Sequence, residues 1–219
     1  MKNIKVLLAI PVYQHCETET MKSVYDLKVP LGITIQLYFQ KGYTVNQARN
    51  EIVKHSLNKG FDYTFFVDSD MLLPDFALQK LLELNVPIAS GWYIKKVPGT
   101  CIPQLFDRDN TGNIIPINKL PKDKCIEVHG IGFGCVLINN KVFKNMNTNC
   151  WFTYMYYPNG DKVSEDINFC IEAESKGYKI IVDTSIVCGH IGQAMFVPSI
   201  DIFEEEQHKN IRKPEKEII

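Results

Sequence analysis

Long apolar runs are missing from this sequence, and their absence argues against a membrane-spanning helix. No stretch reaches the roughly 20 consecutive apolar residues that such a helix needs. The apolar start, MKNIKVLLAI, meets Pro11 too soon for a signal peptide and instead predicts a buried first strand. An excess of positive charge is missing as well, because the formal net charge of the 219 residues is -1. We therefore expect no nucleic-acid partner.

Paired cysteines and a basic phosphate-binding loop are also absent. The seven cysteines are odd in number and form no C-x-x-C pair, which argues against a disulfide framework or a zinc ribbon. A reducing, cytoplasmic location is the simplest expectation. No glycine-lysine loop of the Walker type occurs. Arginine is scarce, with only three among the 24 basic residues, so Arg49 stands out. Its forked guanidinium suits a diphosphate or a neighbouring carboxylate.

What the sequence does contain is an alternation of strand and helix patterns in its first half. Continuous apolar runs predict strands, and apolar residues at helical spacing predict the helices between them. The expected strands are residues 4–10, 33–39, 62–67 and 86–93, and the expected helices are residues 44–58 and 74–85. This β-α-β order predicts an α/β fold with a central, mainly parallel sheet that is flanked by helices.

The second half follows a different pattern, which predicts a small antiparallel part. Its expected elements are loops and short hairpins over residues 97–124, strands over 125–139 and 179–192, and a helix over 164–177. We expect a single domain over residues 1–200, in two halves that divide after residue 96. The charge-dense residues 201–219 are expected to form a separate tail.

The stretch FFVDSDM, residues 65–71, places two carboxylates at the end of a predicted strand. Side chains on a strand alternate between its faces, so we expect Asp68 and Asp70 to project to the same side. Two like charges this close raise each other's pKa unless a positive charge lies between them. A divalent cation would supply that charge, because carboxylate oxygens are its usual ligands. A solvated turn is the alternative, since Asp and Ser are common in turns.

Two further polar stretches follow predicted strands. PVYQHC, residues 11–16, follows the first strand, and GHIG, residues 189–192, follows the last hydrophobic run. In open α/β sheets ligands bind at the carboxyl ends of the strands, so we expect these stretches and the two aspartates to meet in one site. His190 is then a candidate metal ligand, although an isolated histidine is more often a core or turn residue.

A series of motifs runs through the chain in a fixed order. They are IPVY, QARNEIV, DYTFFVDSDMLLP, IASGWYIKK, GIGFGCVLINNKVF, SEDINFC and CGHIG. Taken together, they resemble the glycosyltransferases of the GT-A fold, in particular the small bacterial and viral enzymes grouped with family 2. The resemblance covers the chain up to about residue 192 and implies the GT-A fold for it.

The resemblance implies a nucleotide-sugar donor and a Mn²⁺ or Mg²⁺ ion. Asp70 would bind the metal, Asp68 would contact the donor's ribose or the water shell of the metal, and His190 would complete the metal site. Imidazole suits Mn²⁺ better than Mg²⁺, which prefers oxygen ligands. The metal would neutralise the donor's diphosphate, which agrees with the lack of a Walker-type loop. Ser69, between the two aspartates, is expected at the donor as well.

The resemblance assigns the catalytic pair to SEDINFC. Asp166 would be the general base that deprotonates the acceptor hydroxyl in an inverting reaction, and Glu165 would help to organise the site. In a retaining enzyme, Asp166 would position the substrate instead. Ordinary helix capping is the structural alternative, because the helix dipole stabilises a carboxylate at a helix N-terminus.

On the donor side, the predicted contacts are Pro11, Tyr13 and Arg49. Tyr13 follows the first strand, where an aromatic ring stacks on the donor's base in relatives, and a half-buried position at the rim is the alternative. For Arg49, an ion pair that orients Asp68 or Asp70 is as plausible as a direct contact with the donor.

On the sugar side, the predicted contacts are Trp92, Tyr93, Gly132 and Phe133. Trp92 and Tyr93 could offer an aromatic platform for a sugar ring, and core packing is the alternative. Gly132 belongs to HGIGFG, whose glycines at strand spacing would leave one strand face bare, so that a sugar could approach the backbone.

These features predict a metal-dependent glycosyltransferase that moves a sugar from a nucleotide-diphosphate donor to a hydroxyl acceptor, which we expect to be a glycan. Residues 1–96 would form the nucleotide-binding half, and residues 97–200 the acceptor and metal half. The resemblance implies a UDP-sugar, but QLYFQKGYT, residues 36–44, lacks the carboxylates with which many relatives read uracil.

Other functions stay open at this point. They are a retaining glycosyltransferase of the same fold, a non-catalytic module that binds a nucleotide sugar or a glycan, and a D-x-D phosphohydrolase. The phosphohydrolases usually carry the motif on their first strand, whereas here it follows the third predicted strand. The charged tail could lead to a further C-terminal domain or to a membrane surface. The viral relatives add a virus-infected host cell to the cytoplasm as an expected location.

Overall fold

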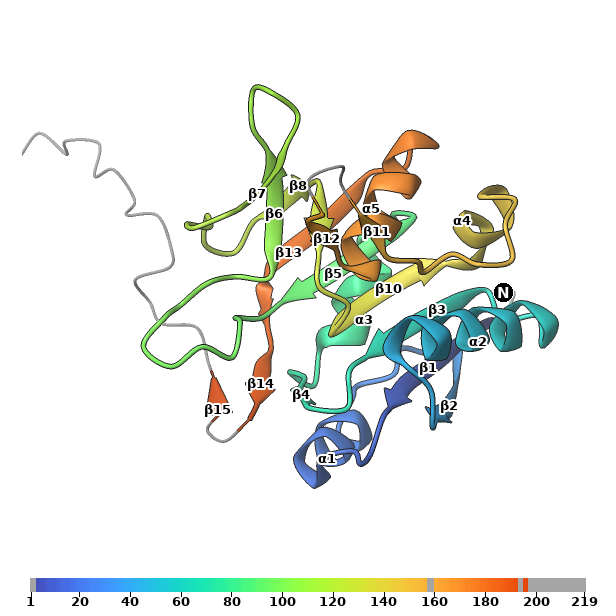
Figure 1. Ribbon diagram of the computed structural model, residues 1–219. Coiled ribbons are helices and arrows are strands. Elements are labelled where there is room, and N and C mark those ends of the chain that lie inside the picture. The colour runs from blue at the N-terminus through green and yellow to red at the C-terminus, as the bar shows by residue number, and fades with distance from the viewer. Residues whose placement is uncertain (1–2, 157–159, 193–194, 197–219) are drawn as a thin grey trace, which may run out of the picture.

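The computed structural model describes residues 3–156, 160–192 and 195–196 (Figure 1). The predicted tail, residues 201–219, lies outside the described residues. Within the described ranges, no helix is both long enough and apolar enough to cross a membrane. The seven cysteines lie within the described residues, and they form no disulfide bond there.

The elements alternate along the chain much as the sequence predicts. The helices are α1 (Thr18–Tyr25), α2 (Val45–Asn58), α3 (Ala77–Glu83), α4 (Asn140–Asn145) and α5 (Glu165–Ser175). The strands of the main sheet are β1 (Ile4–Val12), β2 (Ile33–Lys41), β3 (Tyr63–Val67), β5 (Ile88–Trp92), β8 (Cys125–Val128), β10 (Cys135–Asn139) and β13 (Ile180–Val187). The shorter strands are β4 (Met71–Leu72), β6 (Leu105–Arg108), β7 (Ile114–Pro116), β9 (Gly130–Ile131), β11 (Met155–Tyr156), β12 (Lys162–Val163), β14 (Gly189–Ile191) and β15 (Met195–Phe196).

The main sheet has seven strands in the order β2-β1-β3-β10-β5-β13-β8. Strand β1 runs parallel to β2 and β3, and β13 runs parallel to β5. Strands β10 and β8 are antiparallel to their neighbours. This mostly parallel sheet confirms the predicted fold class, and the small antiparallel sheets β7-β6-β9 and β15-β14-β4 provide the predicted antiparallel part. Strands from both predicted halves of the chain share the main sheet.

Helices cover both faces of this sheet (Figure 1). On one face, α2, α4 and α5 pack on a core that includes Ile52, Phe143 and Phe169. On the other face, α1 and α3 pack on a second core that includes Leu78. Successive residues of each central strand alternate between the two cores, as a strand buried on both faces requires. The result is a three-layer sandwich whose strand ends stay open for a site.

The sequence misses two short helices and the direction of one strand. Helix α1 spans eight residues and packs on the second core through the partly buried Met21 and Val24, which is too short a pattern to identify a helix. Helix α4 spans six residues, which is too short for a periodic pattern. Residues 125–139 are divided among three strands, of which β10 enters the middle of the main sheet. Apolar runs indicate a buried strand but do not fix its direction.

A buried asparagine anchors α2 to the chain that leads towards α5. The Asn50 side chain is buried. Its Oδ1 accepts hydrogen bonds from the backbone N–H groups of Trp151 (2.7 Å) and Phe152 (3.0 Å). Its Nδ2 donates to the Phe152 carbonyl oxygen (2.8 Å) and to the Asn46 carbonyl oxygen within the helix (2.9 Å). The amide therefore satisfies backbone groups that would otherwise be buried without a partner.

Replacing Asn50 by alanine should lower the free energy of unfolding by about 2 kcal/mol, because it leaves several buried backbone groups unpaired. Urea titration followed by circular dichroism measures this loss. Asn58→Ala, at the exposed C-terminal end of the same helix, is the matched control and should stay within about 0.5 kcal/mol of the wild type. Equal stability of the two variants would contradict an anchoring role for Asn50.

Candidate active site

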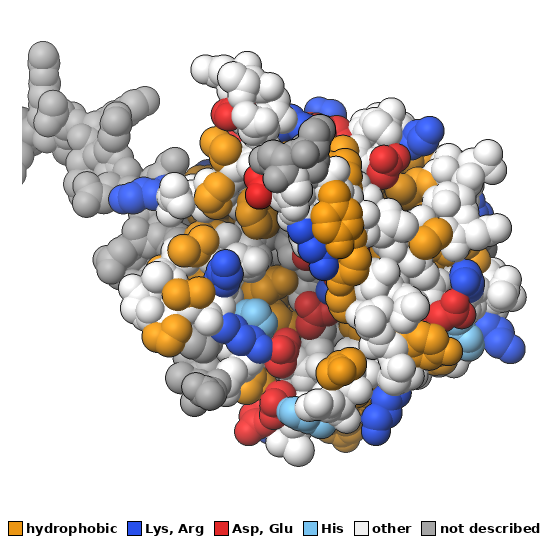
Figure 2. Space-filling model, viewed as in Figure 1, with side chains coloured by type: hydrophobic (Ala, Val, Ile, Leu, Met, Phe, Trp, Pro, Cys, Tyr) orange, Lys and Arg blue, Asp and Glu red, His pale blue; other side chains and the backbone are white. Residues whose placement is uncertain are grey.

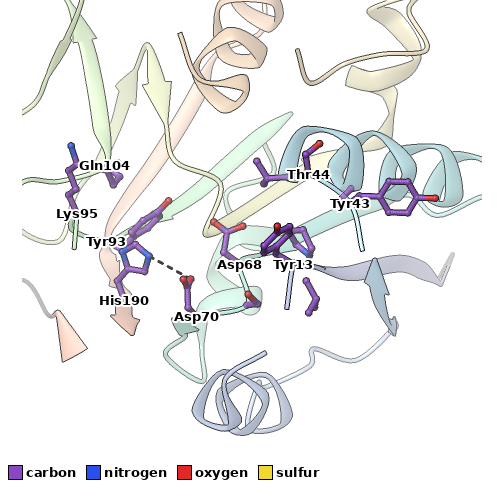
Figure 3. Close-up of a pocket in the computed structure, with 14 residues that line it drawn as sticks. Tyr13, Tyr43, Thr44, Asp68, Asp70, Tyr93, Lys95, Gln104 and His190 are labelled. Atoms are coloured by element: carbon purple, nitrogen blue, oxygen red, sulfur yellow. Dashed lines mark ion pairs between the residues drawn. The ribbon is translucent and has the colours of Figure 1, made fainter. Parts of the chain in front are cut away.

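A pocket of about 530 Å³ opens at the carboxyl ends of β1, β3 and β5 (Figure 3). This is the position that the fold class predicts for a ligand. Its lining includes seven of the residues predicted from the sequence, namely Pro11, Tyr13, Asp68, Ser69, Asp70, Tyr93 and His190. Figure 2 shows acidic side chains and a histidine within a hollow of this face, with lysine or arginine side chains beside it.

Behind the pocket, Arg49 joins the two acidic motifs of the sequence. Its Nη2 donates to Asp68 Oδ1 at 2.9 Å, and its Nη1 donates to Glu165 Oε1 at 2.5 Å. Only 3% of the Arg49 side chain and 7% of the Glu165 side chain are exposed. Arg49 lies on α2, Asp68 follows β3, and Glu165 begins α5. A single buried cation therefore fixes three elements around the pocket.

The surroundings of Arg49 keep it charged. Burial alone would lower the pKa of the guanidinium, but the charges of Asp68 and Glu165 raise it well above its ordinary value. The guanidinium carbon lies 5.2 Å from the centroid of the Phe133 ring, which provides a cation–π contact. Its buried Nε has no hydrogen-bond partner. Both forked nitrogens are thus committed to carboxylates, which favours the ion-pair alternative for Arg49 over direct contact with a donor.

Asp70 faces two basic side chains of its own. Its Oδ2 accepts a hydrogen bond from Lys96 Nζ at 2.5 Å, and its Oδ1 lies 3.6 Å from His190 Nε2 (Figure 3). Burial alone would raise the pKa of the Asp70 carboxyl, but His190 and Lys96 lower it below its ordinary value. Pairing of β4 with β14 places His190 opposite Met71, so the neighbouring Asp70 and His190 meet through backbone register.

The two aspartates follow β3 in a turn in which Met71 N–H donates to the Asp68 carbonyl oxygen at 3.3 Å. They therefore do not continue the strand alternation that we predicted, although both side chains line the pocket. The positive charge that two neighbouring carboxylates need is present in the protein itself, as Arg49 on Asp68 and Lys96 on Asp70.

Asp70 and His190 fit a divalent cation as two of its ligands. His190 Nδ1 lies 2.9 Å from the Ile94 carbonyl oxygen, which can only accept, so Nδ1 carries the proton. Nε2, the other ring nitrogen, faces Asp70 Oδ1, and a bond from one ring nitrogen to a carbonyl oxygen is typical of metal-binding histidines. No group of three or more His, Cys, Asp or Glu side chains that could hold a metal occurs in the described ranges. Further ligands would have to come from a bound diphosphate or from water.

Asp166 lies in the first turn of α5, next to Glu165. Its Oδ1 accepts hydrogen bonds from the Ser164 hydroxyl and from the backbone N–H of Ile167 (2.8 Å). The N-cap residue Ser164 forms no side-chain cap bond, and the Asp166 carboxylate lies in the first turn, where the helix dipole can stabilise it as the structural alternative states. The two hydrogen bonds to Oδ1 fix the carboxylate through one oxygen, and its charge contributes to raising the pKa of both Arg49 and Tyr93.

The predicted sugar platform needs correction. Trp92 is fully buried and its indole N–H donates to the Thr184 carbonyl oxygen at 2.9 Å, so its ring cannot face a sugar. Phe133 is fully buried too, beneath Arg49. Gly132 does not leave a bare strand face, because a Cβ atom there would lie 2.2 Å from the Tyr93 hydroxyl oxygen. These three residues support the site from behind it.

Tyr93 is the one member of that predicted set that lines the pocket, although it is only 6% exposed. Its ring packs edge-on against the His190 ring, with 4.9 Å between the centroids. Burial first, and then the charges of Asp68 and Asp166, raise the pKa of its hydroxyl well above the ordinary value. A neutral tyrosine that holds the histidine is the role that these contacts support.

Of the predicted donor-side residues, Pro11, Tyr13 and Ser69 line the pocket, whereas Arg49 lies behind it. Tyr13 is 72% exposed at the rim of the pocket, where a planar ligand can reach its ring. Ser69 lines the pocket, and its carbonyl oxygen accepts hydrogen bonds from Glu17 N–H (2.9 Å) and the Thr20 hydroxyl (3.2 Å), which fixes α1. Among the seven further lining residues, four with polar side chains were not predicted as site residues: Tyr43, Thr44, Lys95 and Gln104. They lie on loops or near element ends, where no periodic pattern identifies them.

Comparison with solved structures agrees with this architecture. A197 from STIV has a TM-score of 0.58 and 15% sequence identity, and the match covers 94% of this chain and 100% of that one. S. aureus TarS, a glycosyltransferase, has a TM-score of 0.50 and 14% identity over 90% of this chain and 37% of the TarS chain. The fold is GT-A-like. No family model and no curated protein matches the sequence.

Removing the charge of Arg49 should be strongly destabilising. Arg49→Met leaves Asp68 and the buried Glu165 without their shared cation, and we expect a loss of about 3–5 kcal/mol in the free energy of unfolding. The double variant Arg49→Met with Glu165→Met removes the buried pair together and should recover part of that loss. Denaturant titration of both variants and of Glu165→Met measures the coupling. A loss below about 1 kcal/mol in Arg49→Met would contradict the central role of this ion pair.

Proposed function

We propose that the protein is a metal-dependent, inverting glycosyltransferase that uses a nucleotide-diphosphate sugar and a hydroxyl acceptor. One observation carries the proposal. In a GT-A-like fold, the buried Arg49 joins the turn that carries Asp70 to the helix end that carries Asp166. A group that can hold a metal and a group that can accept a proton are thereby linked through one buried cation, although Asp70 lines the pocket and Asp166 is not among its lining residues.

Each group then has a role that its surroundings support. When bound, Mn²⁺ or Mg²⁺ would neutralise the donor's diphosphate, and Asp70 and His190 are the side chains that would hold it. Tyr13 at the rim stacks on the base, and Tyr43 and Thr44 lie along the same part of the lining. No carboxylate of residues 36–44 reads the base, so a UDP-sugar is a proposal from family resemblance alone.

The chemistry assigned to Asp166 is a single proton transfer. Its Oδ1 is held by Ser164 and Ile167, and its Oδ2 takes the proton of the acceptor hydroxyl. The acceptor oxygen forms a bond to the anomeric carbon as the bond from that carbon to the diphosphate oxygen breaks. The nucleoside diphosphate leaves with the electron pair. We propose a glycan as the acceptor, on the side of the pocket where Gln104 lies.

A donor screen tests the proposed function directly. We expect one nucleotide sugar among UDP-, GDP-, ADP- and dTDP-sugars, at about 100 times its Kd, to raise the melting temperature by about 5 °C when Mn²⁺ is present. The shift should vanish in EDTA and in Asp70→Asn, because the diphosphate then lacks its counter-charge. Differential scanning fluorimetry measures it. If no nucleotide sugar raises the melting temperature, with or without metal, the proposal fails.

Asp166→Asn tests the catalytic base. The amide oxygen can still accept from Ser164 and Ile167, so the fold and donor binding should be unchanged, but the side chain cannot take a proton. We expect release of nucleoside diphosphate, with water or a glycan as acceptor, to fall by at least about 100-fold. Glu172→Gln, on the exposed side of the same helix, is the control and should keep wild-type turnover.

Two results would point to the alternative functions. Wild-type turnover in Asp166→Asn would favour a retaining reaction, in which this carboxylate takes no proton. Donor binding without any turnover in the wild-type protein, across a panel of glycan acceptors and water, would favour a binding module.

A further inference from the structure

Lys96 contacts the proposed metal ligand although neither the fold nor the reaction described above assigns it a role. Its Nζ lies 2.5 Å from Asp70 Oδ2, and the two side chains are 29% and 32% exposed. Lys96 follows β5, two residues beyond the Ile94–Pro103 bridge. It reaches Asp70 from a second cavity of about 280 Å³, which shares Tyr13, Ser69 and Asp70 with the main pocket. The Asp70 carboxylate thus lines both cavities, and the Lys96 ammonium lies on the side of the second cavity.

The two oxygens of Asp70 have different partners. Oδ1 lies 3.6 Å from His190 Nε2, and Oδ2 accepts a hydrogen bond from Lys96 Nζ. Asp68 shares the single positive charge of Arg49 with Glu165, so part of its negative charge is already compensated. A divalent cation that binds Asp70 in the absence of any other anion would therefore meet an ammonium on the same carboxylate, and like charges at that distance repel.

We propose that Lys96 is an exchangeable counter-cation that competes with the divalent metal for Asp70 when no nucleotide sugar is bound. This inference rests on the proposed function, since it assumes that Asp70 is a metal ligand. The ammonium holds the carboxylate in the free protein and must leave Oδ2, or share it, when the metal binds. The long side chain allows this exchange without movement of the backbone.

The exchange has a consequence for donor binding. With the metal bound and Lys96 nearby, the site carries an excess of positive charge, which the diphosphate of a donor neutralises. Metal and donor then stabilise each other's binding, because each supplies the charge that the other lacks. A lysine that served only as a surface ion pair would contribute little to stability and would have no such effect on metal affinity.

Mn²⁺ binding to the nucleotide-free protein tests the proposal without any measurement of turnover. Free Mn²⁺ is followed by electron paramagnetic resonance during titration of the full chain at fixed ionic strength. We expect Lys96→Met and Lys96→Gln to bind Mn²⁺ about fivefold more tightly than the wild type, because the competing cation is gone. Lys96→Arg, which keeps the charge, should bind Mn²⁺ like the wild type.

Lys28→Met is the matched control, since Lys28 Nζ forms an ion pair with Asp75 Oδ2 at 2.7 Å away from the pocket lining. It removes the same charge and should leave Mn²⁺ affinity unchanged. Equal or weaker Mn²⁺ binding by Lys96→Met and Lys96→Gln would overturn the exchange and leave the metal site intact. If neither the wild type nor the Lys96 variants bind Mn²⁺, or if Asp70→Asn binds Mn²⁺ as tightly as the wild type, the metal site at Asp70 is wrong. The exchange is then wrong as well. The donor screen is carried out whichever of these results is obtained. It shows separately whether the protein binds nucleotide sugars.

Discussion

The buried ion pairs of Arg49 hold this site together. Its guanidinium contacts Asp68 after β3 and Glu165 at the start of α5, while its own helix packs on the main sheet. Removing such a charge from water is costly, and the cost is recovered only when geometry and partners are good. The Phe133 ring beneath it and the two carboxylates in front meet that requirement. The two acidic motifs therefore cannot shift relative to each other without exposing a charge.

This arrangement divides four carboxylates into two kinds. Asp68 and Glu165 share the one positive charge of Arg49, and their ion pairs hold the end of β3, α2 and α5 together. Asp70 instead contacts Lys96 and lies near His190, and Asp166 is held through one oxygen by Ser164 and the backbone of Ile167. Spacing alone does not distinguish the two members of either pair, and the roles expected for them came from the family resemblance. The fold adds that one arginine lies between one member of each pair.

Local patterns in the sequence were enough to predict the sheet, most helices and the position of the pocket. Apolar runs and helical spacing identify β1, β3, β5 and α2, and polar residues after strands identify the pocket, because parallel strands end at one edge. Contacts between distant segments were not predictable. Two explanations of Arg49 stayed open until α5 was placed beside it. The glycines of HGIGFG looked like an open surface for a sugar, but Tyr93, some 40 residues earlier in the chain, fills that space.

Two glycines that do not leave an open strand face, Gly132 and Gly134, help to orient His190 through Tyr93. Gly132 and Gly134 leave room for the Tyr93 ring, since a Cβ atom at either position would come within 3.0 Å of it. That ring packs edge-on against His190, whose other nitrogen is bound to the Ile94 carbonyl oxygen. Tyr93, Ile94 and the two glycines lie in motifs that were predicted to contact the substrate. Together they hold the imidazole ring of His190 in place. Under the proposed function, selection of the sugar would then depend on residues that line the pocket from loops and element ends, among them Lys95 and Gln104. The ion pairs of Arg49 with Asp68 and Glu165 do not involve these two residues.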